Sequence, residues 1–128
     1  MIRLKIIQRP NPLDATADRK YYVSSQTEGD ITLEEMSELI SEKCTLTETD
    51  VLAAITALMR EMTLNLMTGK IVRFGSFGSF KLSLNSSGVA TETEATRLQV
   101  KGARVRFRPG KRIEDSLRNL KDTLTTKE

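Results

Sequence analysis

The sequence predicts an α+β fold, because its hydrophobic pattern changes along the chain from a strand period to a helix period and back. The opening residues alternate apolar and basic side chains, residues 32–68 carry apolar side chains at helical spacing, and residues 70–108 return to alternation. Residues 111–124 are again helical in pattern. At 128 residues the chain has the length of one main domain with a modest core.

The first thirty residues predict an N-terminal extension with short strands. The stretch MIRLKII alternates apolar and basic side chains, which is typical of a strand. Pro10 and Pro12 follow and exclude a central strand or a helix at that point. KYYV (Lys20–Val23) predicts a second short strand, and residues 24–30 a loop.

Two helices follow, each with a capping signal at its start. Thr32 precedes Glu35 by three residues, and Thr47 stands in the same relation to Asp50. Gly69 is the expected end of the second helix, since glycine favours the left-handed conformation found there. The single cysteine, Cys44, is expected to be a small buried hydrophobe.

The second helix is apolar over more than one face. One stripe consists of Val51, Ile55, Leu58, Met62 and Leu66, and further apolar residues widen it: Leu52, Met59 and Leu64. A helix that covers one face of a small domain needs a stripe of only about 100°. The extra width indicates a second buried surface, formed with another copy of the chain. The alternative is a central helix within a monomer.

The rest of the chain predicts a sheet and a final helix. Residues 70–74 and 79–84 alternate as strands on either side of a tight connection. Residues 85–99 are polar and without a period, which indicates a flexible arm or long loop. Residues 101–108 alternate again, and residues 111–124 place leucines and an isoleucine on one side of a helix.

The stretch FGSFGSF, residues 74–80, superficially resembles a phosphate-binding glycine loop. Such a loop leads from a strand into a helix, often with a lysine placed for the phosphates. Here Gly75 and Gly78 are followed by another strand, so we interpret them as residues of a tight turn. The three phenylalanines are expected to supply core.

Positive charge is concentrated in one quarter of the chain. Residues 81–112 carry eight basic and two acidic side chains, a net charge of +6, whereas residues 1–80 carry a net charge of −2. Arg104, Arg106 and Arg108 alternate with inward-facing residues, so the three guanidinium groups share one strand face and repeat about every 6.5–7 Å. Such a row suits the phosphates of a polyanion. The alternative is a solvated face paired with carboxylates from elsewhere.

Several function classes are disfavoured by composition. The chain has no histidine and one cysteine, so it lacks a Cys/His metal cluster and an imidazole base. We expect no enzymatic activity, catalytic residue, metal, cofactor or small-molecule substrate. No apolar stretch is long enough to span a bilayer and no leader opens the chain, so a cytoplasmic location without membrane contact is expected.

The order of elements and two motifs resemble the bacterial HU and integration host factor family of histone-like proteins. GSFGSF matches the family's hairpin motif through Phe77–Phe80, although Ser76 stands where a glycine is usual. RFRPGKRIEDSL matches the family's strand-to-helix motif through Phe107–Lys111. The resemblance covers residues 31–124.

The resemblance implies an HU/IHF-like fold: two N-terminal helices, a three-stranded antiparallel sheet with a β-arm, and a C-terminal helix, assembled as an intertwined homodimer. It divides the chain into the extension (residues 1–30), an HU-like DNA-binding domain (residues 31–124) and a tail (residues 125–128). The extension resembles that of a divergent HU-related subgroup of Bacteroidetes-type proteins with RPNP-like and KYY-like segments.

The arm departs from the family pattern. Family arms carry an Arg-Asn-Pro tip whose proline wedges between base pairs, but residues 85–99 contain no proline. Arg97 is the one basic residue there, beside Glu92 and Glu94, and Val89 is a weak apolar candidate for the tip. We expect the wedge to be missing.

The resulting hypothesis is a sequence-tolerant, double-stranded DNA-binding architectural protein of the nucleoid. It would act as a homodimer through its sheet and arms, on the phosphate backbone and in the minor groove. The alternative is an HU-fold dimer with weak or no DNA binding that serves as a protein-interaction or assembly module. The expected DNA-binding residues are Arg97, Lys101, Arg104, Arg106, Arg108, Lys111, Arg73 and Lys81.

Overall fold

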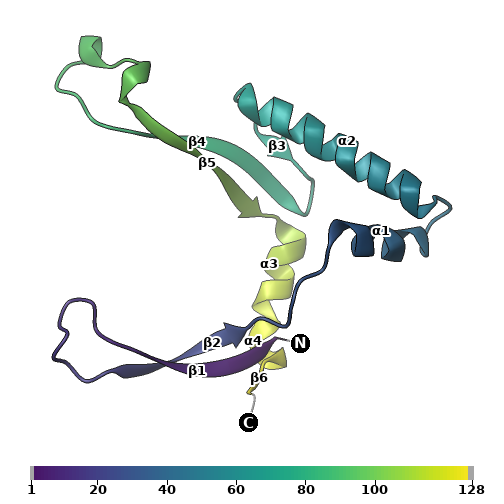
Figure 1. Ribbon diagram of the computed structural model, residues 1–128, viewed down its shortest axis with the longest axis horizontal. Helices are drawn as coiled ribbons and strands as arrows, with labels where there is room; N and C mark the ends of the chain where they lie inside the picture. Colours follow the sequence, from purple (N-terminus) through teal and green to yellow (C-terminus); the bar gives the residue numbers. More distant parts are fainter. Residues whose placement is uncertain (1, 127–128) are drawn as a thin grey trace. The chain divides into compact units, whose positions relative to one another are not determined.

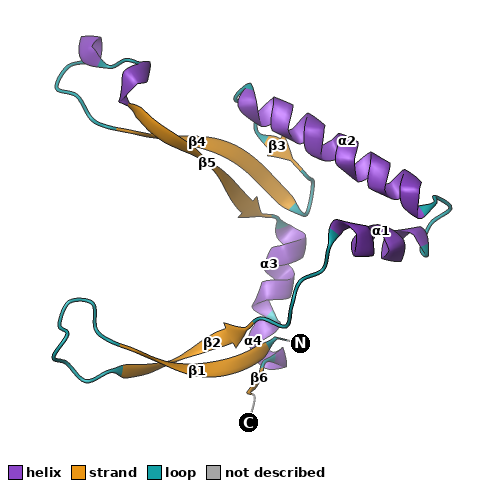
Figure 2. Cartoon of the chain, in the orientation of Figure 1, coloured by secondary structure: helices purple, strands orange, loops and turns teal. Residues whose placement is uncertain are grey.

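The computed structural model describes residues 2–126, which form two compact units. The first combines the N-terminal residues up to Ile31 with the C-terminal residues from Ser116, and the second spans Thr32–Asp115. Helices and antiparallel strands are mixed along the chain, which confirms the α+β class (Figures 1 and 2). The division of the chain at residues 30 and 124 stays a prediction.

The first unit contains a three-stranded sheet in the order β2-β1-β6. β1 (Arg3–Arg9) and β2 (Lys20–Gln26) form an antiparallel hairpin, so both predicted strands are present. β2 runs three residues past the predicted end, because Ser24–Gln26 pair with the start of β1. In the expected tail, β6 (Thr125–Thr126) pairs in parallel with the start of β1. The rest of that tail, residues 127–128, lies outside the described residues.

Two capped helices open the second unit. α1 (Leu33–Ser41) begins where the Thr32 hydroxyl accepts a hydrogen bond from the Glu35 N–H at 3.2 Å. α2 (Glu48–Met67) begins in the same way, with the Thr47 hydroxyl and the Asp50 N–H at 3.2 Å. Gly69, at φ +85°, follows the end of α2. Both helices lie where the capping signals predict them.

Cys44 lies in the turn between these helices. The expectation of a buried thiol is wrong, because α1 ends at Ser41 and the Cys44 side chain is exposed. That expectation depended on a helical pattern that included Cys44, but Cys44 lies beyond the end of α1.

The sheet of the second unit has the order β3-β4-β5 and is antiparallel throughout. β3 (Val72–Arg73) is short, whereas β4 (Gly78–Ser86) and β5 (Val100–Pro109) form a long two-stranded ribbon (Figure 1). Residues 87–99 connect these strands and include two 3-10 turns, Glu92–Glu94 and Arg97–Gln99. A three-stranded sheet with a β-arm is therefore present.

The FGSFGSF stretch makes the turn from β3 to β4, as the sequence predicts. The Phe74 N–H donates to the Gly78 carbonyl at 2.8 Å, and Gly75 has φ +54°. The turn has a second role that the sequence did not indicate. The Phe77 carbonyl accepts from the Gly110 N–H at 2.8 Å, and the Ser76 carbonyl accepts from the Arg112 N–H at 3.0 Å. These bonds fasten the end of β5 and the start of the next helix to the turn.

The C-terminal helical segment is interrupted. A single helix over residues 111–124 was expected, but α3 (Lys111–Arg118) and α4 (Leu120–Thr123) are separated at Asn119. Asparagine has a low helix propensity because its side chain competes for backbone hydrogen bonds. The apolar spacing alone did not reveal this break.

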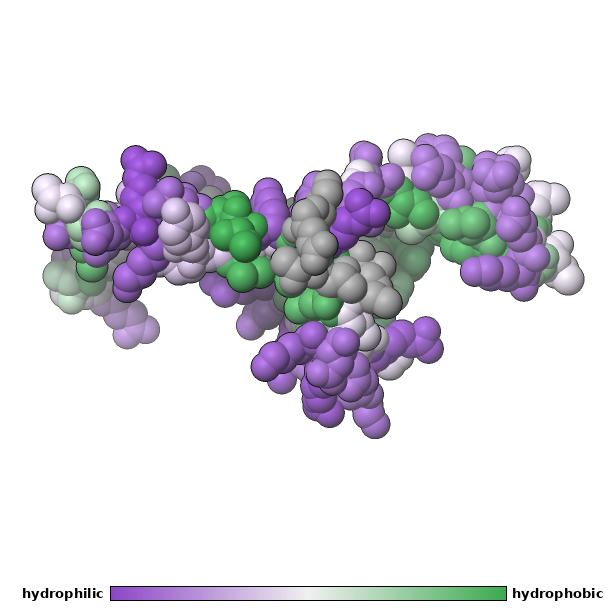
Figure 3. Space-filling view, turned by 90° about the horizontal axis from the view of Figure 1, so that it is seen from below, coloured by the Kyte–Doolittle hydropathy of each residue, from purple (hydrophilic) through white to green (hydrophobic). Residues whose placement is uncertain are grey.

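Few apolar side chains are buried in the single chain. Among residues 2–126 only Val51 and Leu66, both on α2, are buried apolar residues. Ser37 is buried too, and its hydroxyl donates to the Leu33 carbonyl at 2.8 Å. Hydrophobic groups are visible at the surface in Figure 3. On α1 and α2 the exposed apolar residues are Met36, Leu39, Ile40, Leu58, Met59, Leu64 and Met67.

Candidate nucleic-acid interface

One face of the β4–β5 ribbon is basic. Arg104, Arg106 and Arg108 occupy alternate positions on β5, so their side chains share a face. The register places Arg106 directly opposite Lys81, and it pairs the other two arginines with Ser83 and Ser79 of β4. Basic side chains and small hydroxyls, all of them hydrogen-bond donors, therefore share this face.

β3 extends the same face by one cation. Arg73 pairs with Ser79, which pairs in turn with Arg108, so the three residues form one row across the sheet. Arg73, Lys81, Arg106 and Arg108 line an open hollow of about 560 Å³. The structure thus brings together five of the predicted site residues: Arg73, Lys81, Arg104, Arg106 and Arg108. We call these five the basic sheet face.

No carboxylate of the described residues neutralises the basic sheet face. Within residues 2–126 no Asp or Glu oxygen lies within 4.0 Å of a nitrogen of these five side chains. All five are exposed. Lys81 and Arg106 are like charges in directly opposed positions, an arrangement that destabilises a strand pair. Positive charge without a carboxylate partner among residues 2–126 is thus held at a fixed place on the sheet.

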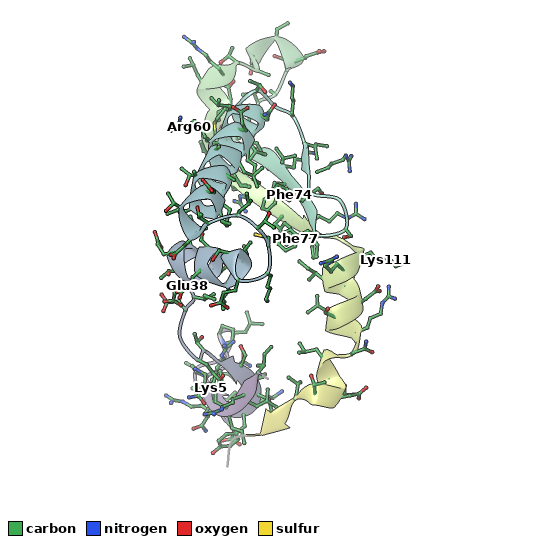
Figure 4. All side chains as sticks on the ribbon, turned by 90° about the vertical axis from the view of Figure 1, so that its right-hand side faces the viewer. Lys5, Glu38, Arg60, Phe74, Phe77 and Lys111 are labelled. Carbon is green, nitrogen blue, oxygen red and sulfur yellow. The ribbon has the colours of Figure 1, made fainter. Side chains whose placement is uncertain are left out.

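The opposite face of the sheet is an aromatic cluster that holds the strands together. Phe80 of β4 is paired with Phe107 of β5, and their ring centroids are 4.9 Å apart. Phe77 lies 5.5 Å from Phe107, and Phe74 lies 6.1 Å from Phe80. Figure 4 shows Phe74 and Phe77 side by side. Edge-to-face and tilted rings at these distances stabilise the pairing, so the strand register that aligns the cations is well supported.

The other three predicted residues lie apart from this face. Lys101 is the extra residue at an irregularity of the ladder, because Asn85 pairs with Gly102 and Ser86 with Val100. Arg97 begins the 3-10 turn beyond the ribbon, and Lys111 is the first residue of α3 (Figure 4). Lys101 is also three residues from Arg104, so alternation along β5 does not extend the row to it.

Two features of the arm and face were missed by sequence reasoning. Ser79 belongs to the basic face, and the same alternation that places Lys81 there could have identified it. Leu98, next to Arg97 in the arm, is 83% exposed, compared with 40% for Val89. Leu98 lies in a polar stretch of the sequence, and this could have indicated that its side chain is exposed.

Among the described residues, no group of three or more His, Cys, Asp or Glu is placed to hold a metal ion. None of their helices combines the length and apolar character that a membrane span requires.

The fold is similar to that of a solved structure. It superposes with a TM-score of 0.64 on a protein from Bacteroides vulgatus ATCC 8482 that is provisionally assigned as a bacterial DNA-binding protein. The two sequences are 12% identical over 98% of this chain, which spans about half of the other protein, 47% of its length. No curated protein matches the sequence.

A family model matches almost the whole chain. The matched residues are 1–124, and the family, HU-HIG, is described as an HU domain fused to wHTH, Ig, or a glycine-rich motif. The resemblance to HU-type proteins that the two sequence motifs indicated is thereby confirmed. The chain, with its N-terminal extension included in the match, belongs to the HU-HIG family of HU-domain proteins.

Proposed function

We propose that this chain is a sequence-tolerant architectural protein that binds double-stranded DNA as a homodimer. It acts through the basic sheet face and the β-arms, without enzymatic activity, cofactor or small-molecule substrate. Its location would be the cytoplasmic nucleoid. The proposal goes further than family membership, and it rests chiefly on one observation: five cations on one sheet face have no carboxylate partner among the described residues.

Guanidinium groups in a row suit the DNA backbone. Arg104, Arg106 and Arg108 repeat at the two-residue interval of a strand, about 6.5–7 Å. The planar fork of arginine donates two parallel hydrogen bonds to phosphate oxygens. A strand row of this kind can follow a phosphate backbone without reading bases. Binding would be electrostatic and deformational, with minor-groove contact from the arms.

The remaining predicted residues would contribute from neighbouring elements. Lys101 and Arg97 lie toward the arm and would reach phosphates beyond those contacted by the sheet. Lys111 stands directly after β5 and would act at the opposite end of the ribbon. The proposed set is Arg97, Lys101, Arg104, Arg106, Arg108, Lys111, Arg73 and Lys81.

A second copy of the chain is the proposed partner of the helices. Leu64 and Met67 of α2 are 56% and 63% exposed, and α1 also carries exposed apolar residues. A groove of about 430 Å³ along α2 is lined by Leu52, Ala53 and Ala57 among others. Exposed apolar residues gathered on two adjoining helices favour a protein–protein interface there.

The salt dependence of DNA binding tests the proposal. The full chain is titrated against a duplex of random sequence at two or more salt concentrations. Release of counterions predicts that log K falls linearly with log salt, with a slope of about −0.9 for each phosphate neutralised. Absence of binding at the lowest salt would overturn the proposal.

Arg106→Ala tests the basic sheet face itself. The variant is expected to bind all duplex sequences about equally less tightly, with a salt slope reduced by about 1 for each copy in contact. Lys43→Ala removes one exposed cation from the turn after α1 and is the control. A loss confined to one DNA sequence would indicate base reading instead.

The alternative function is a protein-interaction or assembly module on the same dimeric fold. It is favoured by one observation, the acidic 3-10 turn Glu92–Glu94 in the arm, which would repel phosphates. The same titration separates the two functions, because this module would show weak or no DNA binding at low salt.

A further inference from the structure

The N-terminal hairpin has a basic face of its own. In the β1–β2 register Lys5 pairs with Ser24, and Arg9 pairs with Lys20. These residues occupy alternate positions of their strands, so their side chains share one face, together with the Ile7–Tyr22 pair. Lys5 is labelled in Figure 4. The other face carries Leu4, Ile6, Val23 and Tyr21 and is largely apolar.

The described residues provide no carboxylate partner for three cations of this hairpin face, Lys5, Arg9 and Lys20. Neither β1 nor β2 contains an acidic residue. Arg3, on the same face, forms an ion pair with Glu28 at 2.6 Å. Within residues 2–126 no carboxylate oxygen lies within 4.0 Å of the nitrogens of Lys5, Arg9 or Lys20. All three residues are exposed and therefore available to a partner.

Two of these cations are directly opposed. Arg9 and Lys20 are cross-strand partners at the loop end of the hairpin, and like charges in directly opposed positions destabilise the pairing. The basic sheet face contains the same arrangement, with Lys81 opposite Arg106. A bound polyanion would relieve the repulsion in both hairpins. Solvent exposure alone does not explain why two cations stand opposite one another.

The opposed pair stands beside a hollow. Arg9, Lys20 and Tyr22 line a cavity of about 170 Å³ together with Asn11, Pro12 and Asp18 of the connecting loop. Two cations and one carboxylate leave this hollow positive, with an aromatic edge beside it. The adjoining turn is ordered by hydrogen bonds from Thr16 to Asp14, at 2.6 Å from its hydroxyl and 2.9 Å from its N–H. The cations therefore lie beside a defined loop.

We propose that the face formed by Lys5, Arg9 and Lys20 is a second site for the phosphate backbone of duplex DNA. This inference rests on the proposed function, because it assigns to the N-terminal hairpin the same ligand as the basic sheet face. The hairpin supplies cations at fixed strand positions that have no carboxylate partner among residues 2–126, and DNA phosphates supply the matching charge.

Adjacent serines of β2 provide a direct test. Ser24 lies on the basic face opposite Lys5, and Ser25 lies on the other face opposite Leu4. In a Cys44→Ser background, Ser24→Cys and Ser25→Cys are each exposed to a duplex that carries a disulfide-activated thiol tethered to a backbone phosphate. We expect Ser24→Cys to cross-link and Ser25→Cys to cross-link much less. Ser25 is the more exposed serine, so if accessibility alone decided the reaction, Ser25→Cys would cross-link more than Ser24→Cys.

A charge-removal variant gives the thermodynamic test. Arg9→Gln/Lys20→Gln is expected to reduce the salt slope by about 1.8 for each hairpin copy in contact with DNA. Between about 50 and 200 mM salt, the unaltered chain should then lose about tenfold more affinity than the variant. Lys43→Gln/Lys121→Gln removes the same charge from exposed positions off this face and should leave the slope unchanged. Thermal unfolding should show the first variant at least as stable as the unaltered chain, since it removes a repulsion.

The outcomes separate this inference from the function on which it rests. If the unaltered chain binds no duplex at low salt, the proposed function fails and the inference fails with it. The second outcome is that the unaltered chain binds duplex DNA, but Ser24→Cys and Ser25→Cys cross-link equally and the salt slope of Arg9→Gln/Lys20→Gln equals that of the unaltered chain. In that case only the second site is overturned. Loss of binding to phosphatidylserine vesicles, without any change in duplex binding, would assign the face to a membrane surface and would overturn the inference too.

Discussion

Gly110 stands where the backbone at the end of β5 comes closest to the turn before β4. A Cβ built on Gly110 would lie 2.4 Å from the Ser76 carbonyl oxygen and 2.9 Å from the Gly78 nitrogen. Both are backbone atoms and cannot rotate away. Gly110 also donates its N–H to the Phe77 carbonyl, so a displacement would break a hydrogen bond. The glycine of the strand-to-helix motif is therefore required by close approach.

Gly110→Ala is expected to destabilise the protein by about 1–3 kcal/mol, because the turn and the start of α3 would have to separate. Urea unfolding measures the change. Gly88→Ala is the control, since a Cβ there meets nothing within 4 Å and should shift stability by less than about 0.5 kcal/mol. Equal effects at both glycines would contradict a packing role for Gly110.

At the scale of elements, the sequence predicted best those features that depend on neighbours along the chain. Both helix starts were predictable because a hydroxyl caps an N–H three residues ahead. β6 was not predictable, because two threonines pair with β1 across the whole length of the chain. The end of β2 was missed for the same reason, since Ser24–Gln26 are strand residues only through their partners.

The candidate site shows the same limit. The arginine row follows from the period of one strand, so its members were visible in the sequence. The place of Arg73 in one row with Arg108, across Ser79, depends on the register of three strands, which no local pattern specifies. Lys101 fits the basic stretch in composition, but it is three residues from Arg104, so the two-residue period of the strand already excludes it from the row. The ladder irregularity between Asn85 and Ser86, which leaves Lys101 unpaired, has no signal in composition or hydrophobic pattern.

The arm is expected to contact DNA without kinking it sharply. Residues 85–99 contain no proline, and the arm includes the acidic turn Glu92–Glu94. Fluorescence energy transfer between the ends of a short duplex is expected to report a bend below about 40°, smaller than the kinks that inserted apolar wedges reach. A larger bend that Leu98→Ala abolishes would contradict this and would identify Leu98, which is 83% exposed, as the wedge.

At the scale of the whole molecule, both units carry a two-stranded ribbon with one basic face. On each ribbon two cations oppose one another across the strands, Arg9 with Lys20 and Lys81 with Arg106. In each case the described residues provide no carboxylate partner for the pair. Repetition of a locally unfavourable arrangement in two separate units favours a common cause, and a polyanionic ligand supplies one.

The scarcity of buried apolar residues raises the question of what stabilises the second unit. Val51 and Leu66 are the buried apolar residues of residues 2–126, and two side chains provide little of the hydrophobic free energy that a domain needs. The exposed apolar residues of α1 and α2 would supply the rest if a second copy covered them. Folding and dimerisation would then be a single process, whose apparent stability depends on protein concentration.

Thermal unfolding at several protein concentrations tests this coupling. For a folded dimer of this size in equilibrium with unfolded chains, Tm should rise by about 3 °C for each tenfold increase in concentration. Met59→Lys places a charge on an exposed apolar position of α2 and should lower Tm and the dimer mass seen by light scattering, because the charge would be buried between copies. Thr27→Lys adds the same charge outside the helices and should change neither. A Tm independent of concentration, together with a mass near 14.4 kDa, would show that a second copy does not cover α1 and α2.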